Sequence, residues 1–128
     1  MQPDSISPTT VSDADRQLIA ATYNGFNARQ IDAVLATMHP DVAWPRAWKG
    51  DHVQGYEEVR AYWTQQWQEI NPVVEPVELS RLPDGRTAVR VQQTVHDLNG
   101  KLLHEGQTIH VYTIREGLIQ RMDIQTVL

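Results

Sequence analysis

The stretch "HVYTIREGLIQRMDI", residues 110–124, reads as a β-hairpin and decides much of the fold. Apolar residues run along both of its arms, and the Glu116-Gly117 pair between them is typical of a tight turn. Working outward from that turn, the alternating pattern continues into residues 101–114 on one side and residues 118–125 on the other. We therefore expect two antiparallel strands over these ranges.

Four polar side chains interrupt the apolar pattern of this hairpin. A two-residue turn places His110 directly opposite Asp123. The same register pairs Tyr112 with Arg121. Because paired positions share one face of a sheet, we expect the four side chains to lie together. Whether that face points inward decides what the sequence says about function.

The preceding hairpin indicates which face is inside. Asn99-Gly100 is a strong signal for a type I′ turn, and such a turn places Val89 beside His110. The opposite face is richer in polar residues, so the His110 face should pack toward the helices. One inserted residue would reverse every side chain beyond it, and Gly106 is a possible site for such a bulge. The expected inward face comprises Val89, Val91, Gln93, Val95, His110, Tyr112, Ile114, Ile119, Arg121 and Asp123.

Three helices are predicted ahead of these strands. Ser12 or Asp13 is a suitable N-cap for the first, which should end near residues 24–29. Helical spacing of apolar residues predicts the second over residues 31–38 and the third over residues 56–70. The other predicted strands are residues 41–44, 77–82 and 86–98, with an irregular loop over residues 45–55. Helices followed by a meander of strands indicate an α+β fold, with the helices on one face of a sheet.

The composition bounds the function. The 128 residues suit one domain, which we place at residues 12–128 after a flexible tail over residues 1–11. The chain has no cysteine, which rules out disulfides, and a net charge of −5, which disfavours a nucleic-acid surface. We find neither an apolar run long enough to cross a membrane nor a secretory signal, so a cytoplasmic location without membrane association is expected.

A buried His110 beside Asp123 would suit general acid–base chemistry. The carboxylate raises the pKa of the imidazole while burial lowers it, and the balance can bring a proton-transfer group near neutral pH. Arg121 would favour the ionised form of Asp123, and Tyr112 could hydrogen-bond a substrate carbonyl. The residues predicted to contact an apolar small-molecule ligand are Tyr23, Trp44, Trp48, Trp63, Gln93, Tyr112 and Arg121.

Each of these groups also has an ordinary structural interpretation. His110 with Asp123 could be a satisfied cross-strand pair, and Trp63 could be a core residue. The remaining histidines show no metal-ligand spacing, and no phosphate-binding glycine loop or nucleophile elbow occurs. No metal site and no cofactor are indicated.

Four apolar residues stand on the face predicted to be outward. Ile109, Val111, Met122 and Ile124 would form a compact patch on a polar surface. Because such patches often mark subunit interfaces, we expect a homodimer packed through the sheet.

Three segments together resemble a known family. "YNGFNARQIDAVLATMHPDVAWPRAWKG", "GYEEVRAYWTQQW" and the opening hairpin are similar, in order and spacing, to the SnoaL-like branch of the nuclear transport factor 2-like superfamily. The resemblance covers residues 15–126. It implies a cone-shaped, strongly curved antiparallel sheet wrapped around three N-terminal helices, with a deep pocket and often a dimer through the sheet.

The resemblance also implies roles for the opening residues. Cyclase members carry a pocket His on the penultimate strand and a pocket Asp on the last, which match His110 and Asp123. Asp123 would then be the general acid/base of an aldol-type ring closure, assisted by His110. The ketosteroid isomerase branch fits less well because Trp44 stands where its base precedes a proline, and the second acid of the epoxide hydrolase relay is not evident.

Three functions stay open at this point. The first is a cofactor-independent cyclase- or isomerase-type enzyme acting on an apolar, carbonyl-bearing cyclic or polyketide-like substrate. The second is a binding protein for an apolar ligand, without chemistry. The third is a structural dimeric accessory domain.

Overall fold

The structure is a computed structural model that describes residues 10–46 and 49–126. Two helices, two strands and a third helix precede a run of four strands in the described residues. The helices are α1 (Asp13–Asn27), α2 (Ile31–Leu35) and α3 (Gly55–Trp67). The strands are β1 (Met38–Pro45), β2 (His52–Gln54), β3 (Ile70–Arg81), β4 (Thr87–Asp97), β5 (Leu102–Arg115) and β6 (Leu118–Thr126).

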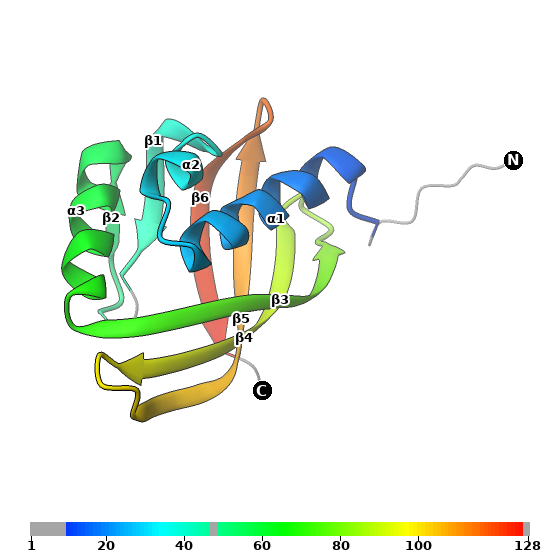
Figure 1. Cartoon of the computed structure of the whole chain (residues 1–128). Coiled ribbons are helices and arrows are strands. Elements are labelled where there is room, and N and C mark those ends of the chain that lie inside the picture. Colours follow the sequence, from blue (N-terminus) through cyan, green and yellow to red (C-terminus); the bar gives the residue numbers. More distant parts are fainter. Residues whose placement is uncertain (1–9, 47–48, 127–128) are drawn as a thin grey trace, which may run out of the picture.

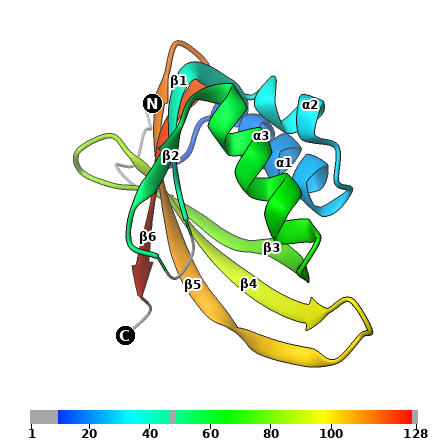
Figure 2. The ribbon, with the colours of Figure 1, turned by 90° about the vertical axis from the view of Figure 1, so that its left-hand side faces the viewer.

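The six strands form one curved, unclosed sheet in the order β2-β1-β6-β5-β4-β3. The three helices lie on its concave side, with α1 running across the strands (Figure 1). Seen from the side, the long strands β3, β4 and β5 bend away beneath the helices (Figure 2). The predicted α+β cone is therefore confirmed. One pairing departs from the expected antiparallel pattern, because β1 and β6 run parallel.

Side chains at both ends of helix α1 form hydrogen bonds with backbone groups. The Ser12 hydroxyl accepts a hydrogen bond from the Asp15 amide, as expected of an N-cap. At the other end, the Asn27 side chain exchanges two hydrogen bonds with the backbone of Val74, at 2.8 and 2.9 Å. Because β3 is an edge strand, these bonds fasten α1 to the sheet while covering part of its open edge.

Several predicted boundaries shift. The second helix ends at Leu35 rather than at Met38, because Met38 already begins β1. The third helix ends at Trp67, since Ile70 is paired in β3. Strand β2 lies inside the segment predicted to be an irregular loop. Val11, assigned to the tail, is buried, while residues 1–9 lie outside the described part of the chain.

The turn at Glu116-Gly117 is confirmed, but the register beyond it is not. Both residues have positive φ, +54° and +78°, as a type I′ turn requires. Ile114 pairs with Ile119 as predicted. The register then shifts by one residue, which leaves Gln120 as the extra residue of a β-bulge.

Beyond the bulge, each side chain of β6 lies on the opposite face of the sheet from the one predicted. His110 lies opposite Ile124, not Asp123. Tyr112 likewise lies opposite Met122 rather than Arg121. The prediction that the four polar side chains share a face is therefore wrong.

Packing gives the physical reason for the bulge. Ile119 and Met122 are both buried, with 0% and 2% of their surface exposed, yet they stand three positions apart. Strict alternation would put one of them outside. The inserted residue brings both to the inner face. The bulge also lies where β1 joins β6, and the Ile119 amide donates to the Thr37 carbonyl there.

The preceding hairpin reaches the predicted register by a different route. Asn99 does not have the positive φ of a type I′ turn; instead Asp97 bonds to Lys101, and Gly100 adopts φ +91°. This longer loop shifts the register by one residue, and a second irregularity after Leu102 shifts it back. The predicted pairing of Val89 with His110 therefore holds, and the bulge proposed at Gly106 is absent.

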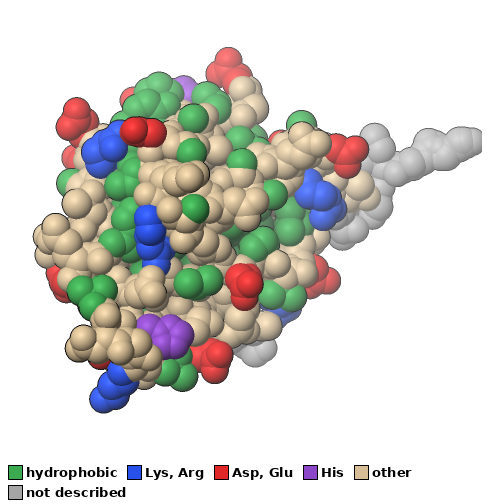
Figure 3. All heavy atoms as spheres, in the orientation of Figure 1, with side chains coloured by type: hydrophobic (Ala, Val, Ile, Leu, Met, Phe, Trp, Pro, Cys, Tyr) green, Lys and Arg blue, Asp and Glu red, His purple; other side chains and the backbone are tan. Residues whose placement is uncertain are grey.

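The predicted outward patch does not form. Met122 and Ile124 belong to the inner face, and Val111 is completely buried. On the opposite side of the molecule, which carries α1 and faces the viewer in Figure 3, hydrophobic side chains are interspersed with polar ones. Within the described residues, no helix has the length and apolar character needed to span a membrane.

Candidate functional site

A cavity of about 60 Å³ lies between the helices and the concave face of the sheet. In comparable terms one water molecule needs about 10–15 Å³, so the cavity has room for a few waters. None of the described residues that line it is acidic, lysine or arginine. The lining residues are Thr22, Tyr23, Phe26, Val34, Trp44, Pro45, Tyr62, Trp63, Gln66, Pro72, Val74, Gln93, His110, Met122 and Ile124.

Three polar side chains form a hydrogen-bonded chain at one end of the cavity. The Tyr112 hydroxyl donates to the Tyr23 hydroxyl at 2.7 Å. The Tyr23 hydroxyl lies 2.8 Å from His110 Nδ1. Helix α1 contributes Tyr23, while β5 contributes the other two on its inner face. All three are buried, so this chain joins a helix to the sheet through the core.

Burial keeps these groups neutral. It lowers the pKa of His110 to about 4, because the charged imidazolium loses its hydration and gains no carboxylate partner. Burial likewise raises the pKa of Tyr112, with only partial opposition from its hydrogen bond to Tyr23. The pKa of Tyr23 is raised by burial and then by the charge and hydrogen bond of Tyr112. At neutral pH the polar end of the cavity therefore carries no formal charge.

Aromatic side chains form the remaining wall. The Trp63 ring meets Trp44 edge-on, with 5.4 Å between ring centroids, and Phe26 in the same manner at 5.5 Å. Trp67 stacks on Trp63, with 6.0 Å between ring centroids. Such edge-to-face contacts stabilise a rigid wall that offers ring faces to an apolar ligand.

The structure brings most of the predicted ligand contacts together. Tyr23, Trp44, Trp63 and Gln93 line the cavity along with His110. Tyr112 stands behind them and reaches the cavity through Tyr23. Trp48 lies outside the described residues.

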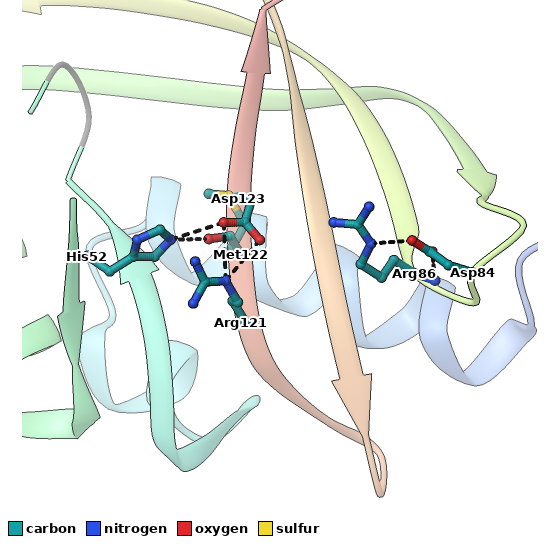
Figure 4. A network of polar contacts seen from close by, with 6 residues as sticks. All are labelled: His52, Asp84, Arg86, Arg121, Met122 and Asp123. Atoms are coloured by element: carbon teal, nitrogen blue, oxygen red, sulfur yellow. Dashed lines mark hydrogen bonds and ion pairs between the residues drawn. The ribbon is translucent and has the colours of Figure 1, made fainter. Parts of the chain in front are cut away.

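Arg121 and Asp123 lie elsewhere. In Figure 4 their side chains stand in front of the sheet, with the helices behind it. Arg121 Nε donates to the Asp123 carboxylate at 3.0 and 3.2 Å. His52 Nε2 lies 3.3 Å from Asp123 Oδ1 and 3.0 Å from the Met122 carbonyl oxygen. Asp123 thus has His52, rather than His110, as its imidazole partner.

The charges of this outer cluster are those of an exposed ion pair. Partial burial would raise the pKa of Asp123, but the hydrogen bond and charge of Arg121, with the charges of His52 and Arg86, outweigh it and lower that pKa. The carboxylate is therefore ionised at neutral pH. With side chains 30% and 48% exposed, Asp123 and Arg121 form a contact of modest strength.

Some site residues had no usable signal in the sequence. Met122 and Ile124 line the cavity because of the bulge, and their apolar character was the only hint of an inward position. His52 shows no metal-ligand spacing in the sequence, and no local pattern indicates that it lies beside Asp123. Among the described residues, no three histidine or acidic side chains converge to hold a metal ion.

Comparison with known proteins supports the same architecture. A model of the SnoaL-like domain matches residues 19–122. No curated protein matches the chain. Among solved structures, it resembles TerC co-crystallised with polyporic acid, at 25% identity and a TM-score of 0.77, over 90% of this chain and 92% of TerC.

Two more distant structures share the fold. An NTF2-like protein of unknown function from Burkholderia pseudomallei is 23% identical, with a TM-score of 0.77, over 91% of this chain and 92% of its own. A proposed polyketide cyclase from Xanthomonas campestris is 19% identical, with a TM-score of 0.75, over 87% and 88% respectively.

Proposed function

The chain belongs to the SnoaL-like domain family, and on that premise we propose that its cavity binds a small, largely apolar molecule. The observation that carries the proposal is an uncharged, aromatic-walled cavity that ends in the buried group of His110, Tyr23 and Tyr112. Apolar walls with a few convergent polar groups are the usual form of a small-molecule site. TerC, crystallised with polyporic acid, supports the same use of the fold.

The size of the cavity limits the ligand. About 60 Å³ is less than half of the roughly 150 Å³ of a cavity that binds benzene, so even a one-ring ligand must reach into the open mouth or move the lining side chains. A larger ligand would extend through the mouth, where Ile124 is 43% exposed and Tyr62 and Gln66 are half-buried. We therefore place the ring of the ligand against Trp63 and the rest of the molecule near Ile124.

Blocking the mouth should weaken binding. Ile124→Trp adds a large side chain to the lining and should weaken binding of a one-ring ligand such as acetophenone by about tenfold or more, roughly 1.4 kcal/mol. The matched control is Gln125→Trp, one residue further along β6 and facing the other way. Isothermal titration calorimetry measures both. Equal affinities for the two variants would place the ligand outside this cavity.

Isomerase- or cyclase-type chemistry is a second candidate, with a carbonyl-bearing cyclic substrate. The observation that favours it is the titratable imidazole of His110 in the cavity wall. The original assignment of Asp123 as general acid/base with His110 rested on a shared face that does not exist. We propose that any proton transfer involves His110, with Asp123 remaining outside.

Deuterium exchange distinguishes these roles. Exchange at the α-carbon of acetophenone in D₂O, followed by mass spectrometry, should be above background for the wild type and for Asp123→Asn. His110→Phe, which keeps a ring stacked on Tyr23, should reduce exchange to background. Circular dichroism controls for folding. Loss of exchange in Asp123→Asn alone would return the chemistry to Asp123.

A homodimer through the sheet stays a prediction. Its original support, an exposed apolar patch on the outer face, is not present. Light scattering of the purified chain gives the mass that decides the question.

A further inference from the structure

We propose that the cavity selects uncharged ligands that carry a hydrogen-bond acceptor, such as a ketone oxygen, because His110 presents an N–H group to it. This inference rests on the proposed binding function and names the class of ligand. It follows from the direction in which protons must point along the chain of Tyr112, Tyr23 and His110.

The donor-to-acceptor direction of these hydrogen bonds is set first at Tyr112, whose side chain is completely buried. Its hydroxyl has one hydrogen-bond partner within residues 10–46 and 49–126, the hydroxyl of Tyr23. A buried hydroxyl proton without an acceptor costs about 1–3 kcal/mol. Tyr112 must therefore donate to Tyr23 rather than accept from it.

Tyr23 then has a single choice. A phenol has one proton, and the oxygen of Tyr23 is already accepting from Tyr112. Its own proton must point to the other neighbour, His110 Nδ1, 2.8 Å away. Nδ1 is therefore the acceptor, so the neutral imidazole carries its proton on Nε2.

Nε2 is the atom of His110 left for a ligand. His110 lines the cavity, and its side chain makes its one hydrogen bond to the described residues through Nδ1. Other polar groups in the lining are already engaged: the Thr22 hydroxyl bonds to Leu18 and Thr37, and Gln66 bonds to Tyr62. Two other polar groups of the lining matter here: the Gln93 amide, which can either donate or accept, and the Trp63 Nε1–H, a donor that has no hydrogen-bond partner among the described residues.

The same lining disfavours ions. Because the described residues around the cavity include no charged side chain, an ionised carboxylate would lose its hydration without gaining a counter-charge from them. A ketone oxygen keeps a hydrogen bond on entry, whereas a hydrocarbon of the same shape leaves the Nε2 proton unpaired. The cavity therefore distinguishes two ligands of equal size by whether the ligand atom next to His110 Nε2 can accept a hydrogen bond.

Three one-ring probes test this selection. Acetophenone and α-methylstyrene have nearly the same shape and differ by an oxygen in place of a methylene, and benzoate adds a charge. Calorimetry should give acetophenone an affinity about three- to tenfold above that of α-methylstyrene, the range expected of one hydrogen bond. Benzoate should bind more weakly than acetophenone. Benzoate binding as tightly as the ketone would overturn the exclusion of ions.

Two variants assign the preference to one group. His110→Phe should remove the difference between ketone and alkene, while Gln93→Leu should retain it. Equal binding of the two probes to the wild type would overturn the inference and leave the binding function intact. No binding of either probe would overturn the binding function itself.

A second measurement does not need a ligand. Long-range ¹H–¹⁵N spectra of the ¹⁵N-labelled chain at neutral pH distinguish a protonated from an unprotonated ring nitrogen, and His110→Phe assigns the signals. Nε2 should be protonated and Nδ1 unprotonated. A proton on Nδ1 would make His110 the donor to Tyr23 and would overturn the proposal.

Discussion

Replacement of Trp63 by Ala should lower the free energy of unfolding by about 3–5 kcal/mol. Trp63 is completely buried and touches three other aromatic rings, so the truncation leaves a cavity that its neighbours cannot fill. Domains of this size are stable by about 5–15 kcal/mol, so the loss is a large part of the total. Urea denaturation followed by circular dichroism measures it.

A matched variant separates packing from polarity at the same site. Trp63→Phe keeps a ring but removes the Nε1–H group, which is buried and has no hydrogen-bond partner among the described residues. Removing that group relieves a cost, which offsets part of the lost contact area. We expect Trp63→Phe to lose less than about 2 kcal/mol. Similar losses for Ala and Phe would show that ring packing is not what Trp63 contributes.

Acidification should destabilise the fold between about pH 6.5 and pH 4 through His110. Its pKa is about 4 in the folded chain, against an ordinary value of 6.5. Between these values the unfolded chain binds a proton that the folded chain does not, so the free energy of unfolding falls as the pH falls. The total loss is about 3 kcal/mol, at 1.36 kcal/mol for each unit of pKa difference. Denaturant midpoints measured across this range report it.

Two histidine variants isolate the contribution. His110→Phe should flatten the dependence of stability on pH from 6.5 to 4, since the titrating group is gone. His39→Gln removes a half-exposed histidine on β1 and should leave the wild-type slope unchanged. A slope that survives in His110→Phe would assign the acid sensitivity to other groups.

The architecture could be predicted from local signals because those signals are strong. Ser12 caps α1 where expected, and the Glu116-Gly117 turn has the backbone that its residues favour. Turn residues and apolar periodicity act over a few positions, so one sequence reveals them. Strand β2 was missed because three residues in an edge position carry too little pattern.

The site depended on register, which local signals do not determine. A bulge of one residue is invisible to turn rules, and it moved Asp123 from the predicted cavity to the outer face. One hint was present: Ile119 and Met122 are both large and apolar, yet strict alternation separates them. In the other hairpin two shifts cancelled, so the predicted partner of His110 on β4 was right although the turn type was wrong.

The parallel pairing of β1 with β6 also escaped the sequence. Nothing within the segments themselves tells which distant strand will lie beside β6, because that choice depends on how the helices fill the concave side. The aromatic wall was predicted better, since Trp44 and Trp63 had few other places in which to bury so much surface.

The extra residue at Gln120 makes strand length, along with side-chain identity, a variable that sets the polarity of the cavity. Shortening β6 by that one position would swing the carboxylate of Asp123 toward His110 and send Met122 to the outer surface, with the composition otherwise unchanged. A chain with the same residues but without this one position would therefore place an acid in the cavity where this chain places a hydrocarbon side chain. An alignment that closes such a gap would equate an acid-lined chamber with a hydrocarbon-lined one.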